Sequence, residues 1–243
     1  MTRLGEQRSA FKRFYKTATL KDEGGAFSVL LDGRSARTPK KALLATPHRA
    51  LADAIVKEWN AAEDVIDTTR MPQTRLLTTV IDLADEERPS WRDIILDYLK
   101  SDLTCYRALS PAALVEKQAS TWDPLLALWR DRFGVALSTT SGVMAVEQPR
   151  QAIDATASYL EKLAHEPLLA ARTATEIAGS AVIALLATEA PDDRETLFEA
   201  SRLDERFQED RWGVDAGAKE REQAMKADFF AAIEFSRLSS DDA

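Results

Sequence analysis

The side chains best suited to metal binding or nucleophilic catalysis are few and scattered. The chain contains two histidines, His48 and His165, and one cysteine, Cys105. A structural zinc site needs about four clustered ligands, and these residues stand far apart in sequence without partner ligands nearby. A nucleophilic cysteine needs a base and an electropositive setting, whereas Cys105 has Leu103 and Tyr106 as neighbours. We predict histidines in surface or capping positions and a buried cysteine.

Carboxylates are abundant, but no pair stands out. The chain has 40 Asp and Glu residues, with an acidic stretch at Asp204-Glu205, Glu209-Asp210 and Glu220 to Glu222. Such a stretch is typical of a solvated helix face or of a face that recognises a partner. An enzyme that combines Asp or Glu with an arginine such as Arg37 or Arg107 stays open as an alternative function. It would need a deep pocket and carboxylates of perturbed pKa.

Familiar nucleotide and nucleic-acid signatures are absent from the sequence. Neither a P-loop nor a Rossmann glycine pattern is present, and Gly24-Gly25 precedes a strand-like run instead of following one. Acidic residues outnumber the 32 Lys and Arg residues, which gives a formal net charge of -8. Such a chain has no general attraction for phosphate backbones. We therefore predict no nucleotide, no nucleic-acid partner and no cofactor.

The composition indicates a folded protein with one large domain or two small ones. The chain has 243 residues, of which 45% are hydrophobic and 30% charged. Its longest apolar run, residues 177–187, is shorter than the roughly 20 residues that span a bilayer. A single cysteine fits a reducing compartment, and the basic N-terminal region lacks the apolar core of a secretory signal. We predict a soluble protein without membrane insertion, cytoplasmic in a bacterium or in the mitochondrial matrix of a eukaryote.

The first third of the chain predicts a small sheet covered by a helix. Phe27–Leu31 and Arg34–Thr38 read as a hairpin around the turn dipeptide Asp32-Gly33. A short strand is expected over residues 42–45, and Thr46-Pro47 then predicts an N-cap with proline at the first helical position. The apolar stripe of this helix consists of Leu51, Ile55 and Trp59, with Ala54 and Ala62 beside them.

The rest of the chain predicts mostly helix. Helices are expected over 72–84, from Pro89, from Pro111 to Gly134 with a restart at Pro124, and over about 149–164, 167–188, 192–211 and 215–237. Residues 103–106 are expected as a strand or extended linker, and residues 135–146 as a β-hairpin or extended pair. The predicted fold class is α+β, with a small β-containing domain (residues 1–100) and a larger, mainly helical domain (residues 101–243). The chain shows no heptad seam, so we expect a monomer.

All five tryptophans lie on predicted helices: Trp59, Trp91, Trp122, Trp129 and Trp212. Because burial of so large a ring is favourable, we expect each tryptophan in the core rather than on the surface. Tryptophan is also enriched at binding hot spots, which leaves one or two for a partner interface. Composition and spacing alone thus indicate a soluble, two-part α+β protein without a visible active site.

Short sequence words, in a fixed order, resemble a known family. In the N-terminal third they are Arg13-Phe14-Tyr15-Lys16, Leu31-Asp32-Gly33-Arg34, Arg37-Thr38-Pro39, Glu58-Trp59, Met71-Pro72 and Ile81-Asp82. Further along they are Asp102-Leu103, Tyr106-Arg107-Ala108, Gln118, Trp122-Asp123-Pro124-Leu125, Gly142-Val143-Met144, Gly179-Ser180, Leu203-Asp204-Glu205, Gln208 and Trp212-Gly213. Over residues 13 to about 222, the chain resembles the F1 ATPase α-subunit assembly chaperones of mitochondria and some bacteria. It departs from the family pattern at two positions. Gln73 stands where the family has leucine, and Gly217 stands where an acidic residue is expected.

The resemblance implies an ATP-independent chaperone without nucleotide or metal. Such a protein binds the free F1 ATPase α subunit, shields its β-facing surface and hands it over during assembly. It also implies a small β-containing domain joined to a larger helical one. We expect the partner-binding residues to be Glu205, Gln208, Trp212 and Asp215, with Asp102 and Trp59 supporting the site or the fold. A scaffold for a different client would share the acidic, nucleotide-free composition and is a second alternative.

Overall fold

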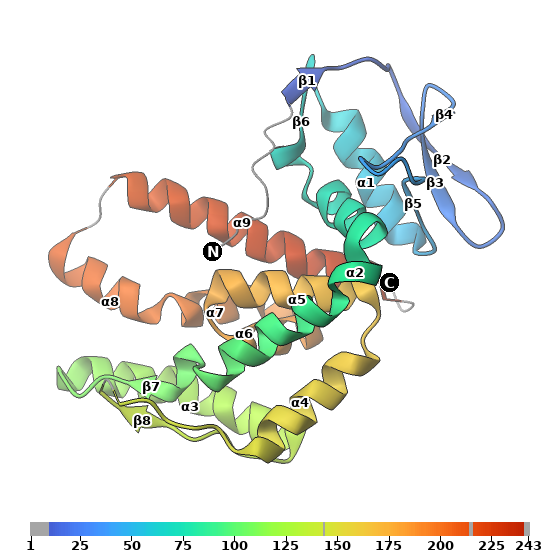
Figure 1. The fold of residues 1–243 in the computed structure, drawn as a ribbon. Coiled ribbons are helices and arrows are strands. Elements are labelled where there is room, and N and C mark those ends of the chain that lie inside the picture. Colours follow the sequence, from blue (N-terminus) through green and yellow to red (C-terminus); the bar gives the residue numbers. More distant parts are fainter. Residues whose placement is uncertain (1–9, 143, 214–215, 241–243) are drawn as a thin grey trace. The chain divides into compact units, whose positions relative to one another are not determined.

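The computed structural model describes residues 10–142, 144–213 and 216–240 and divides into two compact units (Figure 1). The N-terminal unit comprises Met1–Glu86 with Arg237–Ala243, and the helical unit comprises Glu87–Ser236. The α+β fold class is confirmed, because most strands lie in the N-terminal unit and helices dominate the other. The division into domains 1–100 and 101–243 stays a prediction, since compactness alone does not define independently folding domains.

Two antiparallel sheets form the β part of the N-terminal unit. Its strands are β1 (Ala10–Lys12), β2 (Ala18–Asp22), β3 (Phe27–Leu31), β4 (Arg34–Ser35), β5 (Ala45–Thr46) and β6 (Val65–Asp67). Strand β3 pairs with β2, β4 and β5, while β1 pairs with β6. The predicted hairpin is confirmed, and its turn residues Asp32 and Gly33 have φ of 48° and 80°, as a type I′ turn requires. Strands β1, β2 and β6 were not predicted, because β1 is exposed at every residue and β2 and β6 have one buried residue each, too little to give the alternation of a half-buried strand.

Helix α1 (Arg49–Ala61) packs on β2 and β3, as its apolar stripe predicts. Leu51 and Ile55 are fully buried, while Trp59 is half-buried. The helix starts later than predicted, because Thr46 belongs to β5 and His48 takes the N-cap position. The Thr46 hydroxyl instead accepts a hydrogen bond from the His48 backbone N–H at 3.3 Å.

Helix α2 (Pro72–Lys100) is continuous, so the predicted break before Pro89 is wrong. It follows the short 3-10 helix η1 (Thr68–Arg70). Proline lacks an N–H donor and usually kinks or ends a helix. Buried side chains of α2 lie both before and after Pro89, among them Ala84 and Trp91. We infer that packing of both segments keeps the chain helical through the proline.

The helical unit continues with the following elements. They are η2 (Leu103–Cys105), β7 (Tyr106–Arg107), α3 (Ala112–Phe133), β8 (Thr140–Ser141), α4 (Arg150–Lys162), α5 (His165–Ala178), α6 (Ala181–Glu189), η3 (Pro191–Asp193), α7 (Arg194–Ser201), α8 (Leu203–Trp212) and α9 (Ala216–Leu238). Strand β8 pairs in parallel with β7, so the β-hairpin expected within residues 135–146 is wrong. The helix predicted over 167–188 divides at Gly179, whose φ of 67° is left-handed, and the one over 192–211 divides at Arg202.

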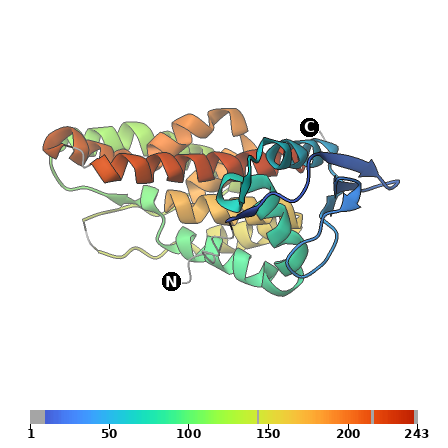
Figure 2. The same ribbon diagram turned by 90° about the horizontal axis from the view of Figure 1, so that it is seen from above.

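Aromatic side chains fill the core of the helical unit. Trp91, Trp122 and Trp129 are buried, as predicted. The Trp122 indole N–H donates to the Ala200 carbonyl at 2.9 Å, and the Phe198 and Phe229 ring centroids lie 5.6 Å apart. These contacts pack α3, α7 and α9 together, and α9 runs beside α7 in both views (Figure 1, Figure 2). In the described part of the chain, no helix is both long and apolar enough to cross a membrane.

Candidate partner-binding site

Helix α8 presents an exposed face that contains three of the predicted partner-binding residues. Glu205, Gln208 and Trp212 follow one another at spacings of three and four, which places them on one side of an α-helix. All three are exposed. Leu203 and Phe207 lie on the opposite side, where Leu203 is buried and Phe207 half-buried. The structure therefore brings Glu205, Gln208 and Trp212 together on the solvent side of α8.

Trp212 is the most conspicuous apolar side chain of this face. It is the last residue of α8 and is 80% exposed. Gly213 follows with a φ of 83° and donates its N–H to the Glu209 carbonyl at 2.8 Å, so the backbone at this helix end is ordered by a capping bond. An indole left in water gives up a large burial free energy. Exposed tryptophans of this kind are typical anchors of protein interfaces.

The acidic start of α8 serves two different purposes. Asp204 accepts a hydrogen bond from Gln118 Nε2 at 2.7 Å, and Gln118 Oε1 accepts from the Ala108 N–H at 2.8 Å. Asp204 therefore anchors α8 to α3. The exposed Glu205 pairs with Arg202 at 3.0 Å. The Glu205 side chain is 48% exposed, whereas that of Arg202 is 21% exposed. The carboxylate of Glu205 is therefore the accessible half of this pair and could also meet a cation of a partner.

Asp102 is buried beneath the start of α6 and does not belong to the α8 face. Its side chain is 0% exposed and accepts hydrogen bonds from the Ser180 hydroxyl (2.8 Å), the Val182 N–H (3.0 Å) and the Thr104 N–H and hydroxyl (3.0 and 2.8 Å). Burial raises the pKa of this carboxyl, and the four hydrogen bonds oppose that rise. Asp102 joins η2 to the N-terminus of α6, so its contacts are those of a fold-supporting residue.

Trp59 lies in the N-terminal unit, packed against Tyr15. The two ring centroids are 5.5 Å apart, and the Tyr15 hydroxyl donates to the Trp59 carbonyl at 2.5 Å. The indole Nε1 is buried without a hydrogen-bond partner among the residues that the structure describes. These contacts attach the segment between β1 and β2, which contains Tyr15, to α1 and so support the fold. Asp215, the remaining predicted residue, lies outside the described residues.

A cavity of about 630 Å³ lies beside α1, β6 and η1 in the N-terminal unit. It contains Glu58, and burial raises the pKa of this carboxyl. Both Glu58 oxygens are already used, because they accept the Gln73 N–H (2.7 Å), the Thr74 N–H (2.8 Å) and the Thr74 hydroxyl (2.7 Å) at the start of α2. Helix capping accounts for this carboxylate. The other charged lining residues are of mixed sign: Lys57, Glu63, Asp64, Asp67 and Arg70.

Cys105 and the histidines occupy the positions expected from the sequence. Cys105 is fully buried, and burial raises the pKa of its thiol to about 12, so the reactive thiolate is not populated near neutral pH. His48 is the N-cap of α1, and His165 is the first residue of α5. Within residues 10–142, 144–213 and 216–240, no group of three or more His, Cys, Asp or Glu side chains could hold a metal ion.

The sequence reading missed Arg206, the charged residue with the most partners on α8. Its guanidinium contacts Glu199, Glu209 and Glu222. Alternation of acidic and basic residues along α8 is visible in the sequence, but it does not identify partners on α7 and α9. The exposed face of α8 can therefore be predicted from helical spacing, whereas the ion pairs of Arg206 cannot.

Comparison with known proteins assigns the family. Residues 12–130 match the family model described as ATP12 chaperone protein. The chain is 24% identical over 218 residues to "Protein atp12, mitochondrial" of Schizosaccharomyces pombe, covering 84% of this chain and 74% of that protein. It is 33% identical to the crystal structure of Atp12 from Paracoccus denitrificans, with a TM-score of 0.88 and coverage of 94% and 98%. A putative chaperone from Agrobacterium tumefaciens is 38% identical, with a TM-score of 0.90 and coverage of 95% and 87%.

These similarities extend over both units and define the class of protein as an assembly chaperone. The chain belongs to the ATP12 chaperone family, which serves assembly of the ATP synthase. The resemblance drawn from the sequence words is thereby confirmed.

Proposed function

We propose that the chain is an ATP-independent chaperone for the free F1 ATPase α subunit. It covers the β-facing surface of that subunit and hands it over during F1 assembly. The observation that supports this role best is the exposed face of α8, where the indole of Trp212 stands in solvent beside the polar side chains Glu205 and Gln208. An apolar anchor surrounded by polar groups is the usual composition of a reversible protein interface.

The chemistry of the client explains why such a chaperone is needed. A free α subunit exposes the surface that later meets β, and exposed apolar surface of that kind drives aggregation. A chaperone that binds this surface more weakly than β does can be displaced by mass action. Each tenfold preference for β corresponds to about 1.4 kcal/mol. Release therefore needs no nucleotide hydrolysis, and we propose a binding protein without catalytic activity.

The proposed site consists of Glu205, Gln208, Trp212 and Asp215. Trp212 inserts into the apolar client surface, while Glu205 meets a basic client residue in place of Arg202. Asp102 and Trp59 act through the fold. We further propose that the protein works as a monomer, in the bacterial cytoplasm or the mitochondrial matrix.

Co-purification tests this function directly. Tagged chaperone is mixed with isolated F1 α subunit in the absence of ATP, and β subunit is then titrated in. Retention of α without β, followed by its loss as β is added, is the expected result. Failure to retain an α subunit that stays soluble would overturn the chaperone function. Retention of α that β cannot displace would overturn the handover.

A further inference from the structure

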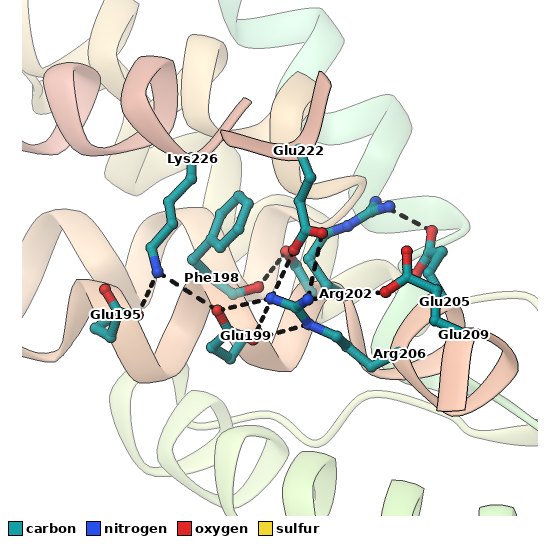
Figure 3. A network of polar contacts seen from close by, with 10 residues as sticks. Glu195, Phe198, Glu199, Arg202, Glu205, Arg206, Glu209, Glu222 and Lys226 are labelled. Carbon is teal, nitrogen blue, oxygen red and sulfur yellow. Dashed lines mark hydrogen bonds and ion pairs between the residues drawn. The ribbon is translucent and has the colours of Figure 1, made fainter. Parts of the chain in front are cut away.

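We propose that Arg206 is the positioning residue of the α8 face. Its guanidinium ties α8 to α7 and α9, and this tie directs Glu205, Gln208 and Trp212 toward the client. The inference rests on the proposed function, because it assumes that this face binds the α subunit. Figure 3 shows Arg206 between glutamates of the neighbouring helices.

The contacts of Arg206 use the planar shape of the guanidinium. Nε donates to Oε2 of Glu199 on α7 at 3.2 Å, and Nη2 donates to both Oε1 (3.2 Å) and Oε2 (3.0 Å) of the same carboxylate. Nη2 also lies 2.6 Å from Oε1 of Glu222 on α9. Glu209, one turn further along α8, lies 3.7 Å from Nη1. Paired donation of this kind fixes direction as well as distance.

A lysine on α9 extends the network (Figure 3). Lys226 Nζ pairs with Glu195 and lies 3.5 Å from Glu199, both on α7. Glu199 is thus shared between Arg206 and Lys226, and the charges on α7, α8 and α9 form one connected group. Networks contribute more than the isolated surface pairs that are worth little by themselves.

Helix α8 has few apolar contacts that could orient it in another way. Leu203 is buried at its first turn, whereas residues 205, 208 and 210–212 are exposed. The hydrogen bond between Gln118 and Asp204 also acts at the first turn. Phe207 is half-buried on the same side of α8 as Leu203, and Arg206 adds the ion pair with Glu222 that links the helix to α9. Each residue advances the helix by about 100°, so a fixed Arg206 also fixes the direction in which Glu205 and Trp212 point.

The test compares Arg206→Gln with a matched cross-helix variant, Arg194→Gln. Arg194 of α7 pairs with Glu234 of α9 at 3.4 Å, so its loss removes an ion pair from the same helix group without touching α8. Affinity for isolated F1 α subunit, melting temperature and amide hydrogen exchange of α8 are measured for each variant. Arg206→Lys, which keeps the charge but not the paired donation, is included as the conservative variant.

We expect Arg206→Gln to weaken α-subunit binding about tenfold, equivalent to about 1.4 kcal/mol. Exchange should rise in α8 while α3 and α6 stay protected, and Arg206→Lys should recover part of the affinity. Arg194→Gln should bind like the wild type. Two outcomes would overturn this inference but leave the proposed function standing. One is wild-type affinity in Arg206→Gln. The other is an equal loss of affinity in Arg206→Gln and Arg194→Gln that parallels a loss of melting temperature. A wild-type protein that does not bind the α subunit would overturn the proposed function and the inference with it.

Discussion

Helices α6 and α8 have nearly equal lengths, 9 and 10 residues, but are held in opposite ways. Residues Ala181 to Leu185 of α6 are all buried, and the buried Asp102 carboxylate accepts the Val182 N–H at the start of this helix. Helix α8 has buried Leu203 at one end, exposed Trp212 at the other, and a network of charges between. Burial makes α6 costly to disturb, whereas surface charges leave α8 accessible. Stability and the proposed client recognition therefore depend on different helices of the same unit, and variants of α6 and of α8 should affect different measurements.

The largest expected effect comes from Trp59, a half-buried residue of the N-terminal unit. Trp59→Arg would put a charge where the indole Nε1 is buried and would remove the ring contact with Tyr15. We expect a loss of at least about 3 kcal/mol, enough to cause misfolding. Circular dichroism and thermal melting of the purified variant measure it. An unchanged melting temperature would show that Trp59 is not a fold residue and would return it to the candidate interface.

Asp102→Ala should destabilise the packing of the start of α6 in the helical unit. It leaves the Ser180 hydroxyl and the Val182 N–H buried without their acceptor, for a cost of about 3 kcal/mol. Urea unfolding measures the difference, with the exposed Asp97→Ala as control. Cys105 gives a second readout, since its thiol pKa of about 12 keeps native Cys105 protonated at pH 8. Alkylation of Cys105 should speed up in Asp102→Ala, because the variant opens the buried site and removes a negative charge that raises the pKa of the thiol. An equally slow reaction would contradict the assigned role.

Trp212→Ala should affect binding without affecting the fold. The side chain is 80% exposed, so unfolding free energy should change by less than about 0.5 kcal/mol. Affinity for the α subunit should fall by about 2 kcal/mol, or roughly 30-fold. Calorimetry or a competition pull-down measures this loss. Leu128→Ala is the matched control, since Leu128 is an exposed apolar residue of α3. Equal losses in both variants would remove Trp212 from the proposed site.

Glu205→Lys should give the smallest effect. It reverses one exposed charge and removes the pair with Arg202, and we expect about fivefold weaker binding, equivalent to about 1 kcal/mol. The loss should appear mainly in the association rate and shrink at high salt. Asp154→Lys, which reverses an exposed charge paired with Arg150 on α4, should leave binding unchanged. A loss that is independent of salt would argue against a charge contact with the client.

Several features were predictable because they depend on neighbours in sequence. The turn at Asp32-Gly33, the apolar stripe of α1 and the end of α3 at Gly134 follow from local backbone preferences and helical spacing. The family resemblance pointed to Glu205, Gln208 and Trp212, and their spacing of three and four is the spacing of one side of a helix. The ordered sequence words indicated the family, which the comparisons confirm.

Other features depend on residues far apart in the chain, and local patterns do not reveal them. Strand β8 is made by pairing with β7, about thirty-four residues earlier, and α2 continues through Pro89 where local preference predicts a break. Asp102 is a buried support because Ser180 and Val182 meet it from α6.

The same division applies within α8. Which residues of α8 share a face follows from helical spacing, which depends only on neighbours in sequence. Which face points to solvent was decided by burial of Leu203 and by the bonds from Arg206 to Glu199 and Glu222. Those partners are brought near only by the packing of α7, α8 and α9, since long-range contacts depend on the whole fold and not on the spacing of neighbours.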